Sequence, residues 1–120
     1  MEIAYWIVAG LLSVVYLYAG GKKLVQSKEQ LQPMMAWVDT VPMRTVRLIG
    51  AIELLGVVGL ILPPLLGIAT FLATAAAIGF VVLQGFAARL HLSRGEAKDT
   101  PFNFGLMALA GVAAWLATAT

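Results

Sequence analysis

The sequence predicts an all-α, polytopic membrane protein. We expect one domain over residues 1–120, with four transmembrane helices in a bundle and a short amphipathic helix in the first cytoplasmic loop. Composition is the first reason: 61% of the residues are hydrophobic and 12% are charged, whereas a soluble domain carries about 25% charged residues. The second reason is that the apolar residues gather in four long segments, and the third is that all basic residues fall on one side of them.

The four apolar segments each come close to the ~20 residues that a helix needs to cross a ~30 Å hydrocarbon core. Lipid cannot hydrogen-bond an open backbone, so each segment should be a helix. The expected spans are residues 3–21, 45–62, 65–88 and 102–120. The first segment lacks the basic start and the small-residue cleavage site of a secretory signal, and we therefore expect it to remain as a span.

Prolines mark two of the boundaries. Pro63 and Pro64 stand between the second and third segments, where we expect the turn, and Pro64 could open the third helix. Pro101 fits the first position of the fourth helix, with Asp99 or Thr100 as its cap, because proline and short polar side chains are favoured at helix starts.

The first connection contains a short amphipathic pattern. Leu31, Met34, Met35 and Val38 follow the i, i+3, i+4, i+7 spacing of one helix face, and Pro33 could start such a helix. We expect it to lie on the membrane surface or to plug the mouth of the bundle. The alternative is a docking surface for a soluble partner.

The basic residues predict the orientation in the membrane. They lie in the first and third connections or just inside the second span: Lys22, Lys23, Lys28, Arg44, Arg47, Arg89, Arg94 and Lys98. By the positive-inside rule, the loops at residues 22–44 and 89–101 should face the cytoplasm. Both termini should then lie outside.

Charge and rare residues exclude several functions. The formal net charge is +2 and the basic residues form no run, which argues against nucleic-acid binding. There is no cysteine, which removes disulfides, thiolate metal sites and dithiol redox chemistry. The single histidine excludes a haem held by two histidines of one chain, and we expect no metal site.

Glu53 is the most informative residue, because it lies alone in the apolar run of the second segment. An ionised side chain at the centre of a membrane helix costs about 2.5–3.5 kcal/mol. Lys23 from the first span, rather than Arg47 on the same helix, could keep the carboxylate ionised. Alternatively, a protonated Glu53 could hydrogen-bond to Tyr16 or Gln84 and hold the bundle together.

Helical spacing places the polar side chains at two depths. The inner layer holds Tyr16, Glu53 and Gln84, and the layer at the cytoplasmic mouth holds Lys23, Arg47, His91 and Asn103. Together they are the candidate ligand-binding residues, and no residue is assigned a catalytic role. Plainer interpretations remain: Tyr16 and Gln84 could serve helix packing, and His91 could be a polar residue facing the mouth.

Three stretches of the sequence resemble the DoxX-like family. AGGKKL at residues 19–24 is similar to the end of the family's first span. RLIGAIELLGVVGLILP at residues 47–63 resembles its second span. ARLHL at residues 88–92, followed by Gly95 and Glu96, resembles the end of its third span.

The resemblance implies a small four-helix bundle in the bacterial inner membrane. The family takes its name from a subunit of a thiosulfate:quinone oxidoreductase. Other relatives are linked to redox-stress complexes and, in animals, to receptor assembly, and many members have no established activity.

Three functions compete. The first is a quinone- or lipid-binding membrane subunit of an oxidoreductase or redox-stress system, in which Glu53 exchanges a proton or accepts a hydrogen bond from a quinol. The second is a non-enzymatic scaffold or assembly factor, and the third is a small transporter that acts as an oligomer. The first would need a redox partner protein, because the chain has no redox centre of its own and we expect no covalently bound cofactor. Membrane lipids and a second copy of the chain are further expected partners.

Overall fold

Four long helices carry the fold, and each is long and apolar enough to cross a membrane. In the computed structural model, which describes residues 3–119, they are α1 (Ile3–Val25), α3 (Met43–Leu66), α4 (Phe71–Ser93) and α5 (Thr100–Ala119). Shorter helices, α2 (Lys28–Leu31), η1 (Ala36–Thr40) and η2 (Ala97–Asp99), lie in the connections. The predicted all-α fold with four membrane spans is confirmed within these residues.

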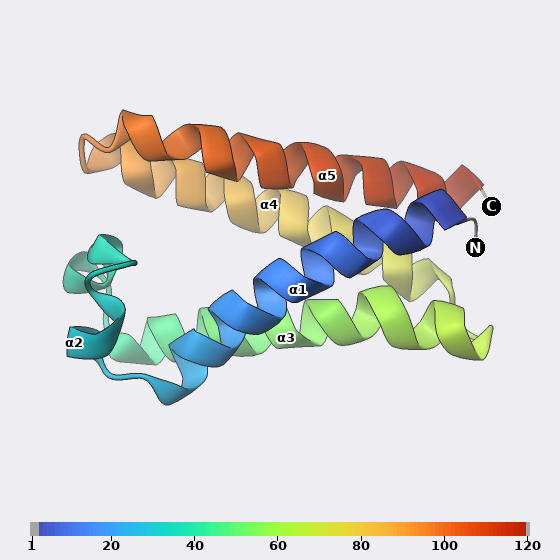
Figure 1. Cartoon of the computed structure of the whole chain (residues 1–120), viewed down its shortest axis with the longest axis horizontal. Coiled ribbons are helices and arrows are strands. Elements are labelled where there is room, and N and C mark those ends of the chain that lie inside the picture. Colours follow the sequence, from blue (N-terminus) through green and yellow to red (C-terminus); the bar gives the residue numbers. More distant parts are fainter. Residues whose placement is uncertain (1–2, 120) are drawn as a thin grey trace.

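The four spans form a ring in which each helix packs against two others. α1 contacts α3 and α5, and α4 contacts α3 and α5. Figure 1 shows α1 crossing the bundle obliquely, from the end of α5 to the opposite end of α3. α1 therefore diverges from α5 as it approaches the first loop, and this divergence opens the bundle at that end.

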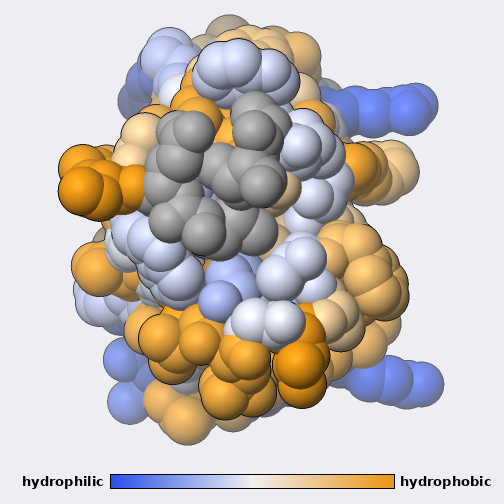
Figure 2. Space-filling view, turned by 90° about the vertical axis from the view of Figure 1, so that its right-hand side faces the viewer, coloured by the Kyte–Doolittle hydropathy of each residue, from blue (hydrophilic) through white to orange (hydrophobic). Residues whose placement is uncertain are grey.

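The two ends of the bundle differ in charge. The chain ends lie together at one end (Figure 1). Seen from there, hydrophobic and weakly polar residues dominate the face, and strongly hydrophilic side chains project only at its margins (Figure 2). The eight Lys and Arg residues fall at positions 22–47 and 89–98, so the opposite end carries the positive charge.

The ring buries a narrow core and leaves its outside apolar. Tyr5, Leu12 and Tyr16 of α1 are almost fully buried, together with Phe80 of α4. Large aliphatic and aromatic side chains on the outside of all four spans are exposed. In water such a surface would be unusual for a monomer, but in a bilayer it is the face that meets acyl chains.

The turn between the second and third spans does not lie at the prolines. α3 continues through Pro63 and Pro64 to Leu66, and α4 begins at Phe71. The predicted turn at the proline pair, and a third span opened by Pro64, were therefore wrong. Gly67 ends α3 instead: it adopts the left-handed conformation (φ 71°), and the following N–H of Ile68 donates to the Pro63 carbonyl at 3.2 Å, as in a glycine-terminated helix end.

α3 tolerates its prolines because another span supplies a missing donor. Proline has no N–H, so Pro64 cannot donate to the carbonyl of Leu60 one turn earlier. The hydroxyl of Tyr5 on α1 donates to that carbonyl at 2.6 Å. The bond is buried, and it ties the start of α1 to the end of α3.

The Tyr5→Phe substitution should destabilise the protein by about 1–3 kcal/mol, because it leaves the buried Leu60 carbonyl without a donor. Pro64→Ala restores a backbone N–H at the right place, so Tyr5→Phe should cost much less in that background. Denaturant unfolding of the two single variants and the double variant in mixed micelles measures this difference. Equal costs of Tyr5→Phe in both backgrounds would contradict the explanation.

The first connection forms two short helices. Ser27 caps α2, with its hydroxyl accepting the Gln30 N–H at 3.2 Å and its own N–H donating to the Gln30 side chain at 2.9 Å. The single helix expected from Leu31 to Val38 is not confirmed, because α2 ends before Pro33 and η1 starts after it. Leu31 and Val38 nevertheless lie in one small apolar cluster, while Met34 is exposed and Met35 is half-buried.

The last span begins close to its predicted start. α5 starts at Thr100, with Pro101 in its first turn. The Thr100 hydroxyl donates backwards to the Ala97 carbonyl at 2.7 Å. The side chain of Asp99, the other predicted cap, and Thr120, the predicted end of the span, lie outside the described part of the chain.

Candidate functional site

A buried ion pair joins the first two spans. Nζ of Lys23, in the last turns of α1, lies 2.6 Å from Oε1 of Glu53 in the middle of α3. Their side chains are only 7% and 3% exposed. Glu53 therefore faces a neighbouring helix and pairs with Lys23, the partner that we expected over Arg47.

Two glycines bring the ion pair together. A Cβ on Gly50 would lie 2.8 Å from the Lys23 Cβ and 2.9 Å from the Gly20 carbonyl oxygen, and a Cβ on Gly20 would lie 3.0 Å from the Gly50 carbonyl oxygen. Any side chain at Gly20 or Gly50 would push α1 and α3 apart. The absence of Cβ atoms thus sets the distance across which Lys23 meets Glu53.

A chain of amide and hydroxyl groups crosses the interior beside the ion pair. Nδ2 of Asn103 on α5 donates to Oε1 of Gln84 on α4 at 2.7 Å, and Nε2 of Gln84 donates to the Tyr16 hydroxyl on α1 at 2.7 Å. The Tyr16 ring stacks on Phe80 with centroids 3.9 Å apart. Tyr16 and Gln84 share one layer as predicted, whereas Asn103 joins this inner network and not the mouth layer.

One buried polar oxygen of this cluster has no partner among residues 3–119. Oδ1 of Asn103 is buried and accepts no hydrogen bond. The Lys23 amine engages Oε1 of Glu53, and no hydrogen bond within the described residues reaches Oε2. A buried acceptor without a donor is costly, so Asn103 Oδ1 marks a place where a ligand hydroxyl or a water molecule would be stabilised.

Arg47 holds the end of α1. Its guanidinium donates to the carbonyl oxygens of Lys23 at 2.6 Å and Gln26 at 2.7 Å. The last carbonyls of a helix lack intrahelical donors, and the N–H of Ser27, the normal partner of Lys23, is used by Gln30. Arg47 is therefore a positioning residue for Lys23.

His91 lies in a second charged cluster at the basic end. Its Nδ1 is 2.9 Å from Oε1 of Glu96, and Nε of Arg94 donates to Oε2 of Glu96 at 3.1 Å. The hydrogen bond with His91, followed by that with Arg94, holds the pKa of the Glu96 carboxyl below its usual range. Arg94 also donates to the Thr40 hydroxyl and the Ala36 carbonyl, both at 3.2 Å, which fastens this loop to η1.

A cavity of about 1170 Å³ lies where α1 diverges from α5. It is bounded by all four spans and by both loops of the basic end. Six of the seven candidate residues line it: Tyr16, Lys23, Glu53, Gln84, His91 and Asn103. Arg47 does not line the cavity, so it could influence a ligand only through α1.

Trp37, Glu96 and Lys98 line this cavity but were not among the residues that sequence reasoning selected. Trp37 in η1 lies at its mouth, with the Lys23 Nζ 5.9 Å from the ring centroid. Glu96 and Lys98 come from the second loop. Helical spacing does not extend through turns such as Gly95 (φ 74°), so it could not place Glu96 or Lys98 beside the cavity, although Glu96 lies in a stretch that resembles the family. No group of three or more His, Asp or Glu residues in the described part of the chain could hold a metal ion.

Comparison with protein families identifies the family of this chain. The model of the DoxX-like family matches residues 7–113, which include all of α3 and α4, most of α1 and α5, and every candidate residue. The chain belongs to the DoxX-like family. We found no similar protein among curated sequences or solved structures. For this DoxX-like protein, function must therefore be argued from the site itself.

Proposed function

We propose that this DoxX-like protein is a membrane subunit that binds a quinone, or a lipid of similar build, for an oxidoreductase or redox-stress system. The supporting observation is the cavity beside the Lys23–Glu53 pair, which combines hydrogen-bonding groups with apolar walls. A ligand with an oxygen-bearing head and an apolar tail matches both features. Most ligand sites likewise combine apolar walls with a few placed polar groups.

The hydrogen-bonding groups suit both forms of a quinone head. The Tyr16 hydroxyl accepts from Gln84, so its own proton remains free to be donated to a carbonyl oxygen of the oxidised form. Asn103 Oδ1 has no partner in the described residues and, with Glu53, can accept from the hydroxyls of the reduced form. The residues supply binding and a proton-accepting carboxylate, and the partner protein must exchange the electrons.

The proposed orientation places this head site near the cytoplasm. The basic end, with the loops at residues 22–44 and 89–101, faces inward by the positive-inside rule, and both termini lie outside. For a bacterial protein the membrane is the inner membrane. A soluble redox partner would then approach the side on which Trp37 and His91 lie.

Quinone binding is the direct test. We expect the purified protein in lipid nanodiscs to bind a tail-free benzoquinone saturably, followed by quenching of tryptophan fluorescence or by equilibrium dialysis. Tyr16→Phe should weaken binding about tenfold, because loss of one hydrogen bond to a ligand costs about 1.4 kcal/mol. Thr70→Val likewise removes one hydroxyl, at an exposed position that does not line the cavity, and this variant should bind as the unaltered protein does.

Two results would contradict the proposal. One is a lack of saturable quinone binding by the unaltered protein, with the folded state verified by circular dichroism. The other is equal affinity of the Tyr16→Phe and Thr70→Val variants. If native mass spectrometry instead finds a phospholipid retained by the unaltered protein and lost from Tyr16→Phe, the ligand is a lipid and not a quinone.

A scaffold function is the second candidate, and the bonds of Arg94 favour it. They join η1 to the loop between α4 and α5 and so form one continuous cytoplasmic surface. In that case, cross-linking in native membranes should recover one dominant partner protein. Its yield should survive Glu53→Gln and fall with Arg94→Ala; the reverse pattern would exclude the scaffold.

A further inference from the structure

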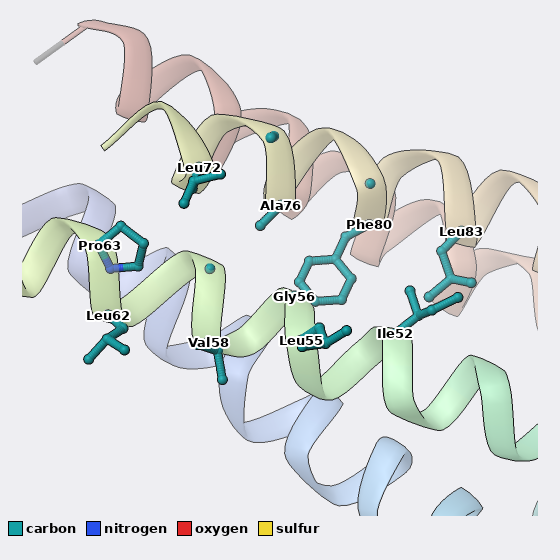
Figure 3. A pocket seen from close by; sticks show the side chains of 13 residues that line it. Ile52, Leu55, Gly56, Val58, Leu62, Pro63, Leu72, Ala76, Phe80 and Leu83 are labelled. Atoms are coloured by element: carbon teal, nitrogen blue, oxygen red, sulfur yellow. The ribbon is translucent and has the colours of Figure 1, made fainter. Parts of the chain in front are cut away.

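A second cavity, of about 570 Å³, lies between α3 and α4 and differs from the first in chemistry. Figure 3 shows the two antiparallel helices side by side, with Pro63 and Leu72 near one end of the cavity and Ile52 and Leu83 near the other. Every lining side chain is apolar, or the residue is glycine. We call this cavity the tail groove and the cavity beside Glu53 the head cavity.

The tail groove continues the head cavity. Leu83 lines both cavities. On α4 one helical stripe runs from the tail groove through Leu83 into the head cavity: Leu72, Ala76, Gly79, Leu83 and Ala87. A stripe on α3 likewise runs from the tail groove to the head cavity: Pro63, Gly59, Gly56, Ile52 and Ile49. Steps of three and four residues keep each stripe on a single face.

Small residues form the bottom of the tail groove. A Cβ on Gly59 would lie 3.0 Å from the Ala76 Cβ, and a side chain on Gly56 would clash with the Phe80 ring. The two helices are therefore in contact at these positions. The longer side chains of Leu55, Leu72 and Leu83 also line the groove. From Ile52 to Pro63 the groove extends about 16 Å along α3, at 1.5 Å per residue.

We propose that the tail groove holds the apolar tail of the ligand whose head occupies the head cavity, an inference that rests on the proposed function. The apolar lining excludes a second head group, since a polar group there would lose its hydrogen bonds. A free acyl chain gains little by leaving other acyl chains, because lipid is as apolar as the groove. A tail tethered to a bound head has a high effective concentration at the groove, and this tether makes the ligand's own tail the favoured occupant.

Filling the groove with protein tests the inference. Gly79 lines the groove, and a Cβ there would meet nothing within 4 Å, so Gly79→Leu occupies the space of the tail without a clash at Cβ. Gly111 on α5 is also exposed with no neighbour within 4 Å of a Cβ, and it lies outside both cavities. Gly111→Leu is therefore a matched control with the same gain in helix propensity.

Affinities for a tail-free benzoquinone and for its polyprenyl-tailed counterpart give the readout, each corrected for partition into the nanodisc. Gly79→Leu should weaken binding of the tailed quinone by roughly threefold to tenfold, the loss expected from removing packing contacts of a few carbon atoms. It should leave the tail-free quinone unaffected. Gly111→Leu should change neither affinity.

A photoreactive group at the end of the quinone tail locates the bound tail independently of the affinity measurements. A diazirine on the quinone tail should label residues 72–79, and excess unlabelled tailed quinone should suppress the labelling. A phospholipid with the same diazirine on its acyl chain is the comparison: it should label all lipid-facing surfaces unless a lipid is the ligand, in which case it labels residues 72–79 selectively.

The outcomes separate the two proposals. If the tail-free quinone binds but Gly79→Leu leaves the tailed quinone unaffected, or the diazirine labels another face, the tail groove is wrong while the head site stands. If neither quinone binds and neither probe labels residues 72–79 selectively, both are wrong. The inference would also be overturned if the quinone and phospholipid probes label the groove equally and excess unlabelled quinone does not suppress the labelling. The groove would then hold bulk lipid.

Discussion

Replacing Lys23 by methionine should destabilise the protein by about 3–5 kcal/mol, because removal of one partner leaves the Glu53 carboxylate buried without its counterion. Glu53→Gln should be similarly costly, since the Lys23 ammonium then loses its anion. The double variant Lys23→Met, Glu53→Gln should recover much of the loss, because no charge is then buried and the desolvation cost of a neutral amide is smaller than that of an unpaired ion. Unfolding of all four proteins in the same mixed micelles provides a double-mutant cycle.

A strong coupling in that cycle is the decisive result. If the two single substitutions cost little, or if their costs simply add in the double variant, the 2.6 Å contact between Lys23 and Glu53 does not stabilise the bundle. Lys22→Met is a suitable control, because Lys22 neighbours Lys23 in the same helix but is not among the residues that line the head cavity. It should leave the free energy of unfolding almost unchanged.

Gly50→Ala should destabilise the protein by about 1–3 kcal/mol through overpacking. The added Cβ would lie 2.8 Å from the Lys23 Cβ and 2.9 Å from the Gly20 carbonyl oxygen, and backbone cannot move aside as a flexible side chain can. The two helices must separate, so the affinity of the head cavity should fall together with stability. Unfolding and quinone binding measure the two effects.

Gly21→Ala is the matched control for that prediction. A Cβ at Gly21 would meet nothing within 4 Å, and alanine is favoured over glycine in a helix interior by about 0.5–1 kcal/mol. Gly21→Ala should therefore be neutral or stabilising. Equal effects of Gly50→Ala and Gly21→Ala would show that helix propensity, and not the contact between α1 and α3, explains the loss.

The sequence predicted the parts of the site that membrane depth governs. Bilayer thickness fixes the length of each span, and a carboxylate at mid-depth must find a cation or take up a proton. Those constraints made Lys23 the expected cation, with a protonated Glu53 as the open alternative, and placed Tyr16 and Gln84 in one layer; the structure shows the pair with Lys23. Each of these residues lies inside a regular helix, where spacing along the chain converts directly into depth.

The predictions that were wrong concern the ends of helices, where hydrogen bonds from other parts of the chain and helix tilt decide the structure. Proline at the end of a span signals a turn when its lost hydrogen bond stays unpaired, but Tyr5 replaces the donor that Pro64 lacks. Asn103 lies early in α5, and its depth relative to α4 follows from helix tilt, which no spacing rule supplies. Arg47 caps carbonyls of α1 because the capping of α2 uses the N–H of Ser27, a competition that only coordinates reveal.

The hydrogen bond between Tyr5 and Leu60 bears on the order of assembly. The end of α3 that contains Pro64 cannot complete its own backbone pairing inside the bilayer, since Pro64 offers no proton to the carbonyl one turn before it. That carbonyl is satisfied only when the first span has docked. Synthesis delivers the spans in the order in which they are needed, so the second span enters the bilayer beside a helix that already carries the missing proton.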